Sequence, residues 1–253
     1  MVDLHVHILP ELDDGAKDWE DALDMADMAS SSGVRTLVAL SHANLPGQNS
    51  AEFLKKYWEQ FYNLENLLKK EGSSLEIVPG MELMSDGRLP GLLKEEKFLT
   101  LNGTKYALIE FDFEVSASQI YEDVDGMLNA GYIPVLAHPE RYGCVSRQIG
   151  HVFEWQQMGA VIQVNKGSIL GRFSERIRRN ADLILKHRIA SVVASDAHSS
   201  EYRTTEMNEV AEILETYYGS ASVEILLKEN PWRILCGEEI LDSMPISFEQ
   251  TLT

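Results

Sequence analysis

Short apolar runs alternate with amphipathic helical patterns along almost the whole chain, and this alternation constrains the fold more than any other sequence feature. The seven runs are nearly continuous in apolar residues, as expected for strands covered on both faces. They lie at residues 2–7, 36–41, 75–80, 106–111, 133–137, 160–164 and 189–194. Strands that alternate with helices predict a parallel sheet, and seven such units favour a closed or distorted (β/α) barrel over an open sheet.

The spacers between these runs carry helical periodicity, with apolar residues at steps of three and four. An Asn49-x-x-Glu52 capping box precedes the second pattern, and Gly33, Gly131 and Gly159 each separate a helical pattern from a strand, as C-terminal caps do. No linker, repeat or low-complexity tract interrupts the chain, so we expect one domain over 1–253. The predicted helices lie near residues 19–29, 53–68, 117–130, 148–158, 174–187, 203–217 and 221–228.

Charge, cysteine content and hydropathy exclude several classes of protein. The 253 residues include 22 Lys+Arg and 40 Asp+Glu, a formal net charge of −18, which argues against binding to the phosphate backbone of a nucleic acid. The two cysteines, Cys144 and Cys236, form no CxxC pair and predict no disulfide framework. No apolar run approaches the length of a membrane span, and the N-terminus lacks the order of a signal peptide, so we expect a cytoplasmic protein.

Five of the seven histidines fall at the carboxyl ends of predicted strands. In a parallel sheet these ends share one edge, where long loops such as 8–17 and 43–50 build active sites. The other two, His151 and His187, sit in helical patterns and are expected to be ordinary surface or packing residues. The five at strand ends are His5, His7, His42, His138 and His198.

Two pairs of residues have the spacing of metal ligands on a strand. Residues i and i+2 point to the same face, so His5 and His7 can hold one ion from one side, and Asp196-x-His198 repeats the spacing after the last strand. One HxH pair alone could equally be two polar residues on an exposed strand face. Two pairs together with two further histidines that end apolar runs favour a metal site, because buried imidazoles and carboxylates need partners.

Carboxylates accompany these histidines. Glu82 and Glu110 close hydrophobic strands, where each is either a metal ligand or a member of a salt bridge at the barrel rim. Asp13-Asp14-Gly15 could also be a turn that leads into a helix, and spacing alone does not decide the role of Asp14. Nitrogen and oxygen ligands without a thiolate suit manganese, iron or zinc, and their number predicts a cluster of two or three ions.

Rival hydrolase chemistries lack their motifs. A cysteine phosphatase needs an arginine after five intervening residues, but Arg147 and Gly150 follow Cys144, and no arginine follows Cys236. There is no GxSxG elbow, Walker loop or GxGxxG. Residues 123–126, Asp-Val-Asp-Gly, weakly match an aspartyl-phosphate phosphatase motif, but they lie in a helical pattern and are interpreted as a solvated helix face.

The order of these motifs resembles the PHP superfamily, named for polymerase and histidinol phosphatase. The matching residues are His5-x-His7, His42, Glu82, Glu110, His138 and Asp196-x-His198. Longer matches resemble the bacterial metal-dependent protein-tyrosine phosphatases of capsule and exopolysaccharide loci. They lie at 3–8 (DLHVHI), 13–15 (DDG), 106–111 (YALIEF), 137–142 (AHPERY) and 194–198 (ASDAH). The resemblance covers about residues 1–240, and the tail after Leu241 has no counterpart.

The resemblance implies a distorted seven-stranded (β/α) barrel with a trinuclear, usually manganese, centre. It assigns one ion to His5, His7, Glu82 and Asp196, a second to Glu82, Glu110 and His138, and a third to Asp14, His42 and His198. Arg141 and Arg203 match the phosphate-binding arginines of the family. Residues 165–167, Asn-Lys-Gly, lie at the edge of the site without an assigned role.

The implied function is hydrolysis of phosphotyrosine on a bacterial tyrosine kinase of capsular or exopolysaccharide biosynthesis, by direct attack of metal-activated water. The tyrosine leaving group has a pKa of about 10, so it demands little of a general acid. The alternatives are a small-molecule phosphomonoesterase such as histidinol phosphatase, a metal-binding regulatory protein without turnover, and an exonuclease, which the acidic charge disfavours.

Overall fold

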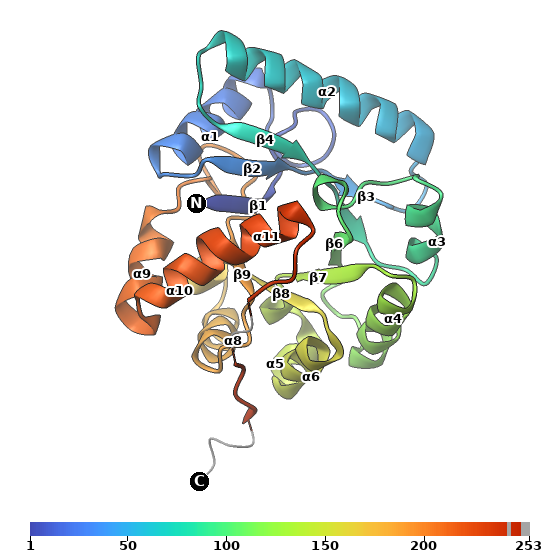
Figure 1. The fold of residues 1–253 in the computed structure, drawn as a ribbon, viewed down its shortest axis with the longest axis vertical. Coiled ribbons are helices and arrows are strands. Elements are labelled where there is room, and N and C mark those ends of the chain that lie inside the picture. Colours follow the sequence, from blue (N-terminus) through green and yellow to red (C-terminus); the bar gives the residue numbers. More distant parts are fainter. Residues whose placement is uncertain (242–243, 249–253) are drawn as a thin grey trace.

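The computed structural model describes residues 1–241 and 244–248, and every strand pair in this part of the chain is parallel (Figure 1). One sheet has the order β1 (Val2–Val6), β2 (Thr36–Ala39) and β4 (Glu76–Pro79). The other has the order β3 (His42–Ala43), β5 (Glu82–Met84), β6 (Tyr106–Glu110), β7 (Ile133–Ala137), β8 (Val161–Asn165) and β9 (Val192–Ala194). Of the tail after Leu241, positions 242–243 and 249–253 lie outside the described residues.

The two sheets together form a distorted α/β barrel, as predicted. The runs predicted at 36–41 and 75–80 end earlier, as β2 and β4, and each is followed after a two-residue interruption by a short strand that was not predicted, β3 or β5. Gly80 stands at one interruption, where a Cβ atom would lie 2.6 Å from the Val38 side chain. Two contacts join the first strand to the segment after the last one. The Asp3 carboxylate accepts from Ser195 N at 3.0 Å, and His7 N donates to the Ala197 carbonyl oxygen at 2.8 Å.

Helices surround these strands (Figure 1). Most fully buried side chains lie in the layer between strands and helices. A second cluster takes residues such as Leu4, Leu108 and Val135 from strands around the ring and Leu235 from the last helix, so it fills the barrel interior. The helices are α1 (Trp19–Ser31), α2 (Ser50–Lys70), α3 (Leu89–Lys94), α4 (Ala117–Asn129), α5 (Gly143–Arg147), α6 (Gly150–Met158), α7 (Lys166–Ile169), α8 (Glu175–Lys186), α9 (Asn208–Tyr218), α10 (Ser220–Glu224) and α11 (Asn230–Cys236).

The predicted helix boundaries are confirmed where a cap marks them. Asn49 Oδ1 accepts from the first backbone N–H groups of α2. Gly33, Gly131 and Gly159 have φ values of 87°, 88° and 114°, a left-handed conformation that glycine adopts without strain. The predicted start of a helix at residue 203 is wrong by five positions, because α9 begins at Asn208 and the preceding residues form a loop.

Two predictions about polar residues on helices have different outcomes. Residues 123–126 do lie within α4, but Asp123 is buried rather than solvated, since its carboxylate accepts from Ser85 Oγ at 2.8 Å and Gln119 Nε2 at 2.9 Å. His187 is a packing residue, as expected, with its ring against Phe248.

Among the described residues, no helix combines the length and apolar character needed to cross a bilayer.

Candidate metal centre

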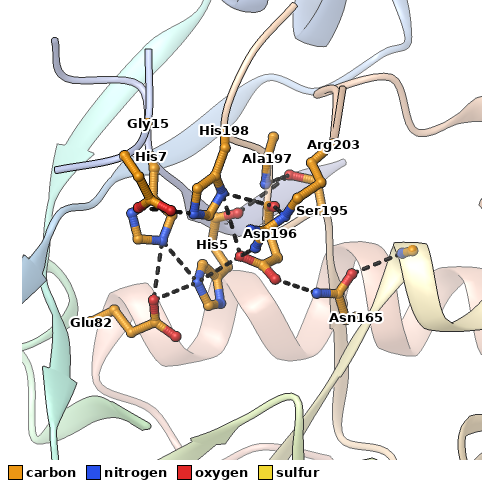
Figure 2. A network of polar contacts seen from close by, with 12 residues as sticks. His5, His7, Gly15, Glu82, Asn165, Ser195, Asp196, Ala197, His198 and Arg203 are labelled. Carbon is orange, nitrogen blue, oxygen red and sulfur yellow. Dashed lines mark hydrogen bonds and ion pairs between the residues drawn. The ribbon is translucent and has the colours of Figure 1, made fainter. Parts of the chain in front are cut away.

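The nine side chains predicted as metal ligands meet at the carboxyl edge of the barrel. Figure 2 shows five of them, His5, His7, Glu82, Asp196 and His198. They form four overlapping groups, and within each group the candidate ligand atoms all lie within 4.8 Å of one another. The groups are His7/Asp14/His42/His198, His5/His7/Asp196, His5/Glu82/His138 and His42/Glu82/Glu110. Each of the nine residues belongs to at least one group. Strand ends far apart in the sequence therefore bring one set of nitrogen and oxygen atoms together.

Glu82 lies at the centre of this cluster. Its Oε2 atom lies 3.1 Å from both His5 Nε2 and His7 Nε2 and 3.2 Å from His42 Nδ1. Its other oxygen lies 3.2 Å from His138 Nε2. Among the described residues, Oε2 accepts no hydrogen bond of acceptable geometry, although the carboxylate is fully buried. A buried carboxylate oxygen that has three imidazole nitrogens nearby, but accepts no well-oriented hydrogen bond, is suited to bridging cations.

Asp196 joins the imidazoles to the arginines. Its Oδ2 atom accepts from Arg141 Nη1 at 3.2 Å. Asn165 Nδ2 also donates to Oδ2, and Oδ1 pairs with Arg203 Nη2 (Figure 2). Burial opposes ionisation of Asp196. The charges of His5, His138 and Arg203 outweigh it and hold the pKa of this carboxyl group below its ordinary value. The carboxylate is therefore ionised and available as a ligand at neutral pH.

Two of the candidate ligands have an unusual backbone. His138 and Asp196 have φ values of 37° and 52°, in the left-handed region that few non-glycine residues adopt. Each follows the end of a strand, where this conformation turns the side chain out of the alternation of the strand. Such strain is concentrated at functional sites, where the surrounding structure holds it in place.

A second layer of residues orients the imidazoles. Asp13 Oδ2 lies 2.8 Å from His7 Nδ1 and also accepts from His42 N at 2.8 Å. Gln163 Oε1 lies 3.0 Å from His5 Nδ1. These contacts leave the Nε2 atoms of His5 and His7 directed into the cluster, as outer partners of metal-binding histidines do. Sequence reasoning missed both roles, although a glutamine within an otherwise apolar strand was a signal for one of them.

The group nearest the solvent contains Asp14. Its Oδ1 atom lies 3.4 Å from His42 Nε2 and 3.5 Å from His198 Nε2, and 69% of its side chain is exposed. Glu110 departs from the grouping implied by the family resemblance, because its Oε1 atom lies 2.8 Å from His42 Nδ1 and does not share a group with His138. Glu110, which the resemblance assigns to the second ion, is therefore in direct contact with His42, which it assigns to the third.

The donor atoms fit divalent cations. His5 Nε2 and His7 Nε2 face each other at 3.2 Å, so without a cation between them one nitrogen must carry a proton. His198 Nδ1 lies 3.1 Å from the Asp196 carbonyl oxygen, so this nitrogen carries the proton. Its Nε2 atom, which faces Asp14, is then free of a proton and can bind a cation. Imidazole and carboxylate donors with no thiolate suit manganese, iron or zinc.

Protonation of the cluster opposes metal binding. Burial lowers the pKa of His7, but Asp13 and Glu82 outweigh it and raise the pKa to about 9. For His42, burial is likewise outweighed by neighbouring carboxylates, which raise its pKa to about 11. Burial lowers the pKa of His198 to about 3, helped by the charge of His7. At neutral pH the metal-free cluster therefore holds protons on two imidazoles that must be neutral to bind a metal.

Binding of Mn²⁺ at pH 7 is expected to release protons from His7 and His42. Because both pKa values are raised in the metal-free state, the apparent metal affinity should increase as the pH rises from 6 to 9. Calorimetric titration in two buffers with different ionisation enthalpies counts the released protons. A binding enthalpy that is the same in both buffers would contradict the protonated state of these imidazoles.

Both predicted phosphate-binding arginines border the cluster. Arg141 contacts Asp196, and its Cζ atom lies 4.6 Å from the ring centroids of both Phe113 and Phe173. Arg203 has a φ of 50° and donates from Nε to the Asp196 carbonyl oxygen at 3.1 Å. The two guanidinium groups therefore lie beside the candidate metal ligands.

Residues 165–167 connect these parts of the site. Asn165 donates to Asp196 from Nδ2 and accepts from Gly167 N at 2.8 Å, which caps α7. The buried Lys166 donates from Nζ to the carbonyl oxygens of Thr204 and Glu206, the latter at 2.9 Å. The segment that the sequence left without a role thus holds a candidate ligand and the loop that carries Arg203.

Lys166→Met is expected to raise KM for a phosphorylated substrate about three- to tenfold while metal content stays unchanged. The substitution removes two hydrogen bonds from a charged donor, each worth about 1.5–3 kcal/mol, and loosens the loop beside Arg203. Steady-state kinetics with elemental analysis measure both effects. Lys186→Met, at an exposed lysine paired with Asp182, is the control. An unchanged KM for Lys166→Met would show that the loop does not depend on this contact.

The parallel barrel, with histidines and carboxylates gathered at the carboxyl ends of its strands, is the arrangement of an α/β-barrel protein with a candidate metal centre. It belongs to the family described as Capsular polysaccharide synthesis, CpsB/CapC, whose model matches residues 1–236. The chain is 33% identical over 249 residues to the tyrosine-protein phosphatase YwqE of Bacillus subtilis (strain 168), covering 97% of this chain and 95% of that protein.

Solved structures agree with this assignment. One reported as YwqE from Bacillus subtilis and CpsB from Streptococcus pneumoniae, "unique metal-dependent tyrosine phosphatases", superposes with a TM-score of 0.88 at 32% identity, covering 98% of this chain and 99% of that chain. The histidinol phosphate phosphatase of Lactococcus lactis subsp. lactis Il1403 has a TM-score of 0.50 at 13% identity, with 97% and 98% of the two chains covered. The latter likeness supports the fold alone.

Proposed function

We propose that the protein is a metal-dependent protein-tyrosine phosphatase that acts on a tyrosine kinase of capsular or exopolysaccharide biosynthesis. The observation that carries this proposal is the convergence of nine candidate metal ligands beside Arg141 and Arg203 at one edge of the barrel. Membership of the CpsB/CapC family and the naming of its relatives as tyrosine-protein phosphatases support the same activity.

Up to three divalent ions, manganese in the first instance and iron or zinc as alternatives, would occupy the cluster. The family resemblance would assign one ion to His5, His7, Glu82 and Asp196, a second to Glu82, Glu110 and His138, and a third to Asp14, His42 and His198. All nine residues lie in the cluster, and Glu110 lies beside His42 in this structure. When bound, such ions activate water for attack on phosphorus and offset charge on the phosphoryl oxygens. Glu82 and Asp196, both ionised and buried, would hold the ligand sphere in place from inside the barrel.

The chain's own residues would bind and orient the phosphoryl group. Arg141 and Arg203 present guanidinium forks, which suit bidentate contact with phosphoryl oxygens, and Asp196 fixes both of them. The four candidate carboxylate ligands contribute four negative charges against six positive charges from three divalent ions. The loaded site would therefore attract a phosphate despite the overall charge of −18.

The partner in this proposal is the phosphotyrosine-bearing tail of the kinase, in the cytoplasm. Asp14 is largely exposed and marks the open side of the cluster, through which a peptide side chain can enter. Cys144 and Cys236 are both free thiols, as is usual for a reducing compartment.

The purified protein loaded with Mn²⁺ is expected to hydrolyse a phosphotyrosine peptide at least about tenfold more efficiently, in kcat/KM, than histidinol phosphate. A tenfold ratio corresponds to about 1.4 kcal/mol of differential transition-state stabilisation. Parallel release of phosphate from the two substrates, at equal metal loading, measures it. Preference for histidinol phosphate would reject the protein-phosphatase proposal and favour a small-molecule phosphatase on the same metal site.

A further inference from the structure

Two phenylalanine rings enclose the guanidinium group of Arg141. Its Cζ atom lies 4.6 Å from the ring centroid of Phe113 and 4.6 Å from that of Phe173. Both distances are within the range of a cation–π interaction. Phe113 lies in the loop between β6 and α4, and Phe173 lies between α7 and α8. Rings from separate loops therefore lie against the same guanidinium group, which also donates to Asp196.

The two rings have different surroundings. Phe173 is partly buried and packs on Gly167, where an added Cβ atom would lie 3.0 Å and 3.2 Å from two of its ring atoms. Phe113 is 45% exposed, and its ring centroid lies 6.2 Å from that of His138. Phe173 is thus the more buried of the two rings beside Arg141. Phe113 is the more exposed ring, with an aromatic surface open to solvent beside a candidate metal ligand.

The backbone holds Phe113 in this place. Its carbonyl oxygen accepts from Gly143 N at 2.7 Å, two residues beyond Arg141. Asp112 Oδ1 accepts from Glu114 N at 2.8 Å and fixes the turn around Phe113. A Cβ atom at Gly143 would lie 3.3 Å from the Phe113 carbonyl oxygen, so a larger residue here would shift the two loops by a few tenths of an ångström. The exposed ring is therefore positioned relative to Arg141 by main-chain contacts.

We propose that Phe113 forms a subsite for the phenyl ring of the substrate and makes the site selective for aryl over alkyl phosphates. This inference rests on the proposed phosphatase function. A phosphoryl group held by Arg141 beside His138 has the exposed surface of Phe113 next to it. The ring of phosphotyrosine, one oxygen away from phosphorus, then contacts Phe113 in an offset-stacked or edge-to-face arrangement. A short alkyl phosphate leaves this surface uncovered.

Binding of non-hydrolysable phosphonates tests the subsite without the influence of leaving-group reactivity. The full chain loaded with Mn²⁺ is titrated by calorimetry with benzylphosphonate and with ethylphosphonate. We expect the wild type to bind the benzyl ligand more tightly. Phe113→Leu should weaken benzylphosphonate binding about three- to tenfold and change ethylphosphonate binding less than about twofold, since aromatic pairs contribute modestly beyond the area that they bury.

Phe173→Leu is the matched control, because Phe173 lies at the same distance from the same guanidinium group but is less exposed than Phe113. It should affect both phosphonates to the same extent, through Arg141 alone. Equal weakening of both ligands by Phe113→Leu would overturn the subsite, as would no effect on either ligand. Equal binding of the two ligands by the wild type would also overturn it.

Failure of the proposed function gives a different result from failure of the subsite. A wild type that prefers benzylphosphonate and loses that preference in Phe113→Leu, but does not hydrolyse a phosphotyrosine peptide, would retain the aryl subsite and reject the phosphatase activity. Hydrolysis of the peptide with an unaltered aryl preference in Phe113→Leu would reject the subsite and retain the activity.

Discussion

Glu82→Gln is expected to lower kcat/KM for a phosphotyrosine peptide by about a thousandfold or more, equivalent to at least about 4 kcal/mol of transition-state stabilisation. The carboxylate lies within 3.2 Å of nitrogens from four histidines and belongs to two of the four candidate ligand groups. An amide of the same shape is neutral and offers one oxygen instead of two. Bound metal should therefore decrease together with activity.

Steady-state kinetics and elemental analysis of the same preparation measure the effect of Glu82→Gln. Glu59→Gln, on the exposed side of α2, is the matched control and should retain both metal and activity. A Glu82→Gln protein with full metal content and activity within about tenfold of the wild type would show that this carboxylate does not hold the centre together.

Arg141→Ala is expected to lower kcat/KM by about 30- to 1,000-fold, a loss of about 2–4 kcal/mol, while metal content stays at the wild-type value. The guanidinium group is fixed by Asp196 and by the rings of Phe113 and Phe173, so it is pre-organised to contact phosphoryl oxygens. Asp196 keeps its contacts with Asn165 and Arg203 after the substitution and remains available as a ligand.

The kinetic comparison for Arg141 uses two further variants. Arg141→Lys keeps the charge but not the planar fork, and should fall between the wild type and Arg141→Ala. Arg147→Ala removes an exposed arginine on the neighbouring helix α5 and should have no effect. Near-normal activity in Arg141→Ala would refute the phosphate-binding role of this residue.

The sequence was sufficient for the strands and for the positions of the candidate ligands because both depend on local patterns. An apolar run that ends in a histidine or acid places that side chain at the carboxyl edge of a parallel sheet, whatever the details of the barrel. His42 and Glu82 were found in this way. The early strand ends at Ala39 and Pro79 and the short strands β3 and β5 were missed, because two or three residues that include a histidine or a glutamate do not show a strand pattern by themselves.

The outer partners of the cluster depend on tertiary contacts that no local pattern shows. Gln163 reaches His5 across 158 positions of sequence, and Lys166 reaches Thr204 across 38. The helix predicted from residue 203 begins late for a related reason. Arg203 adopts a left-handed backbone, and its loop is held by Lys166, so tertiary contacts override the local helical periodicity there.

Asp123 illustrates how a buried hydrogen bond can mislead an interpretation from sequence. Its place in an acidic stretch of a helical pattern indicated a solvated face. Ser85 and Gln119 instead donate to its carboxylate and make burial tolerable. The donor Ser85 follows β5, far from α4 in the sequence, so the burial could not be seen from the helix alone.

Anomalous diffraction at the manganese absorption edge, from crystals grown with Mn²⁺, tests the central claim most directly. We predict two or three peaks within the cage formed by the nine side chains, with Glu82 adjacent to at least two of them. An anomalous map with no peak among these residues, at a Mn²⁺ concentration that supports hydrolysis of a phosphotyrosine peptide, would contradict a metal centre at this edge of the barrel.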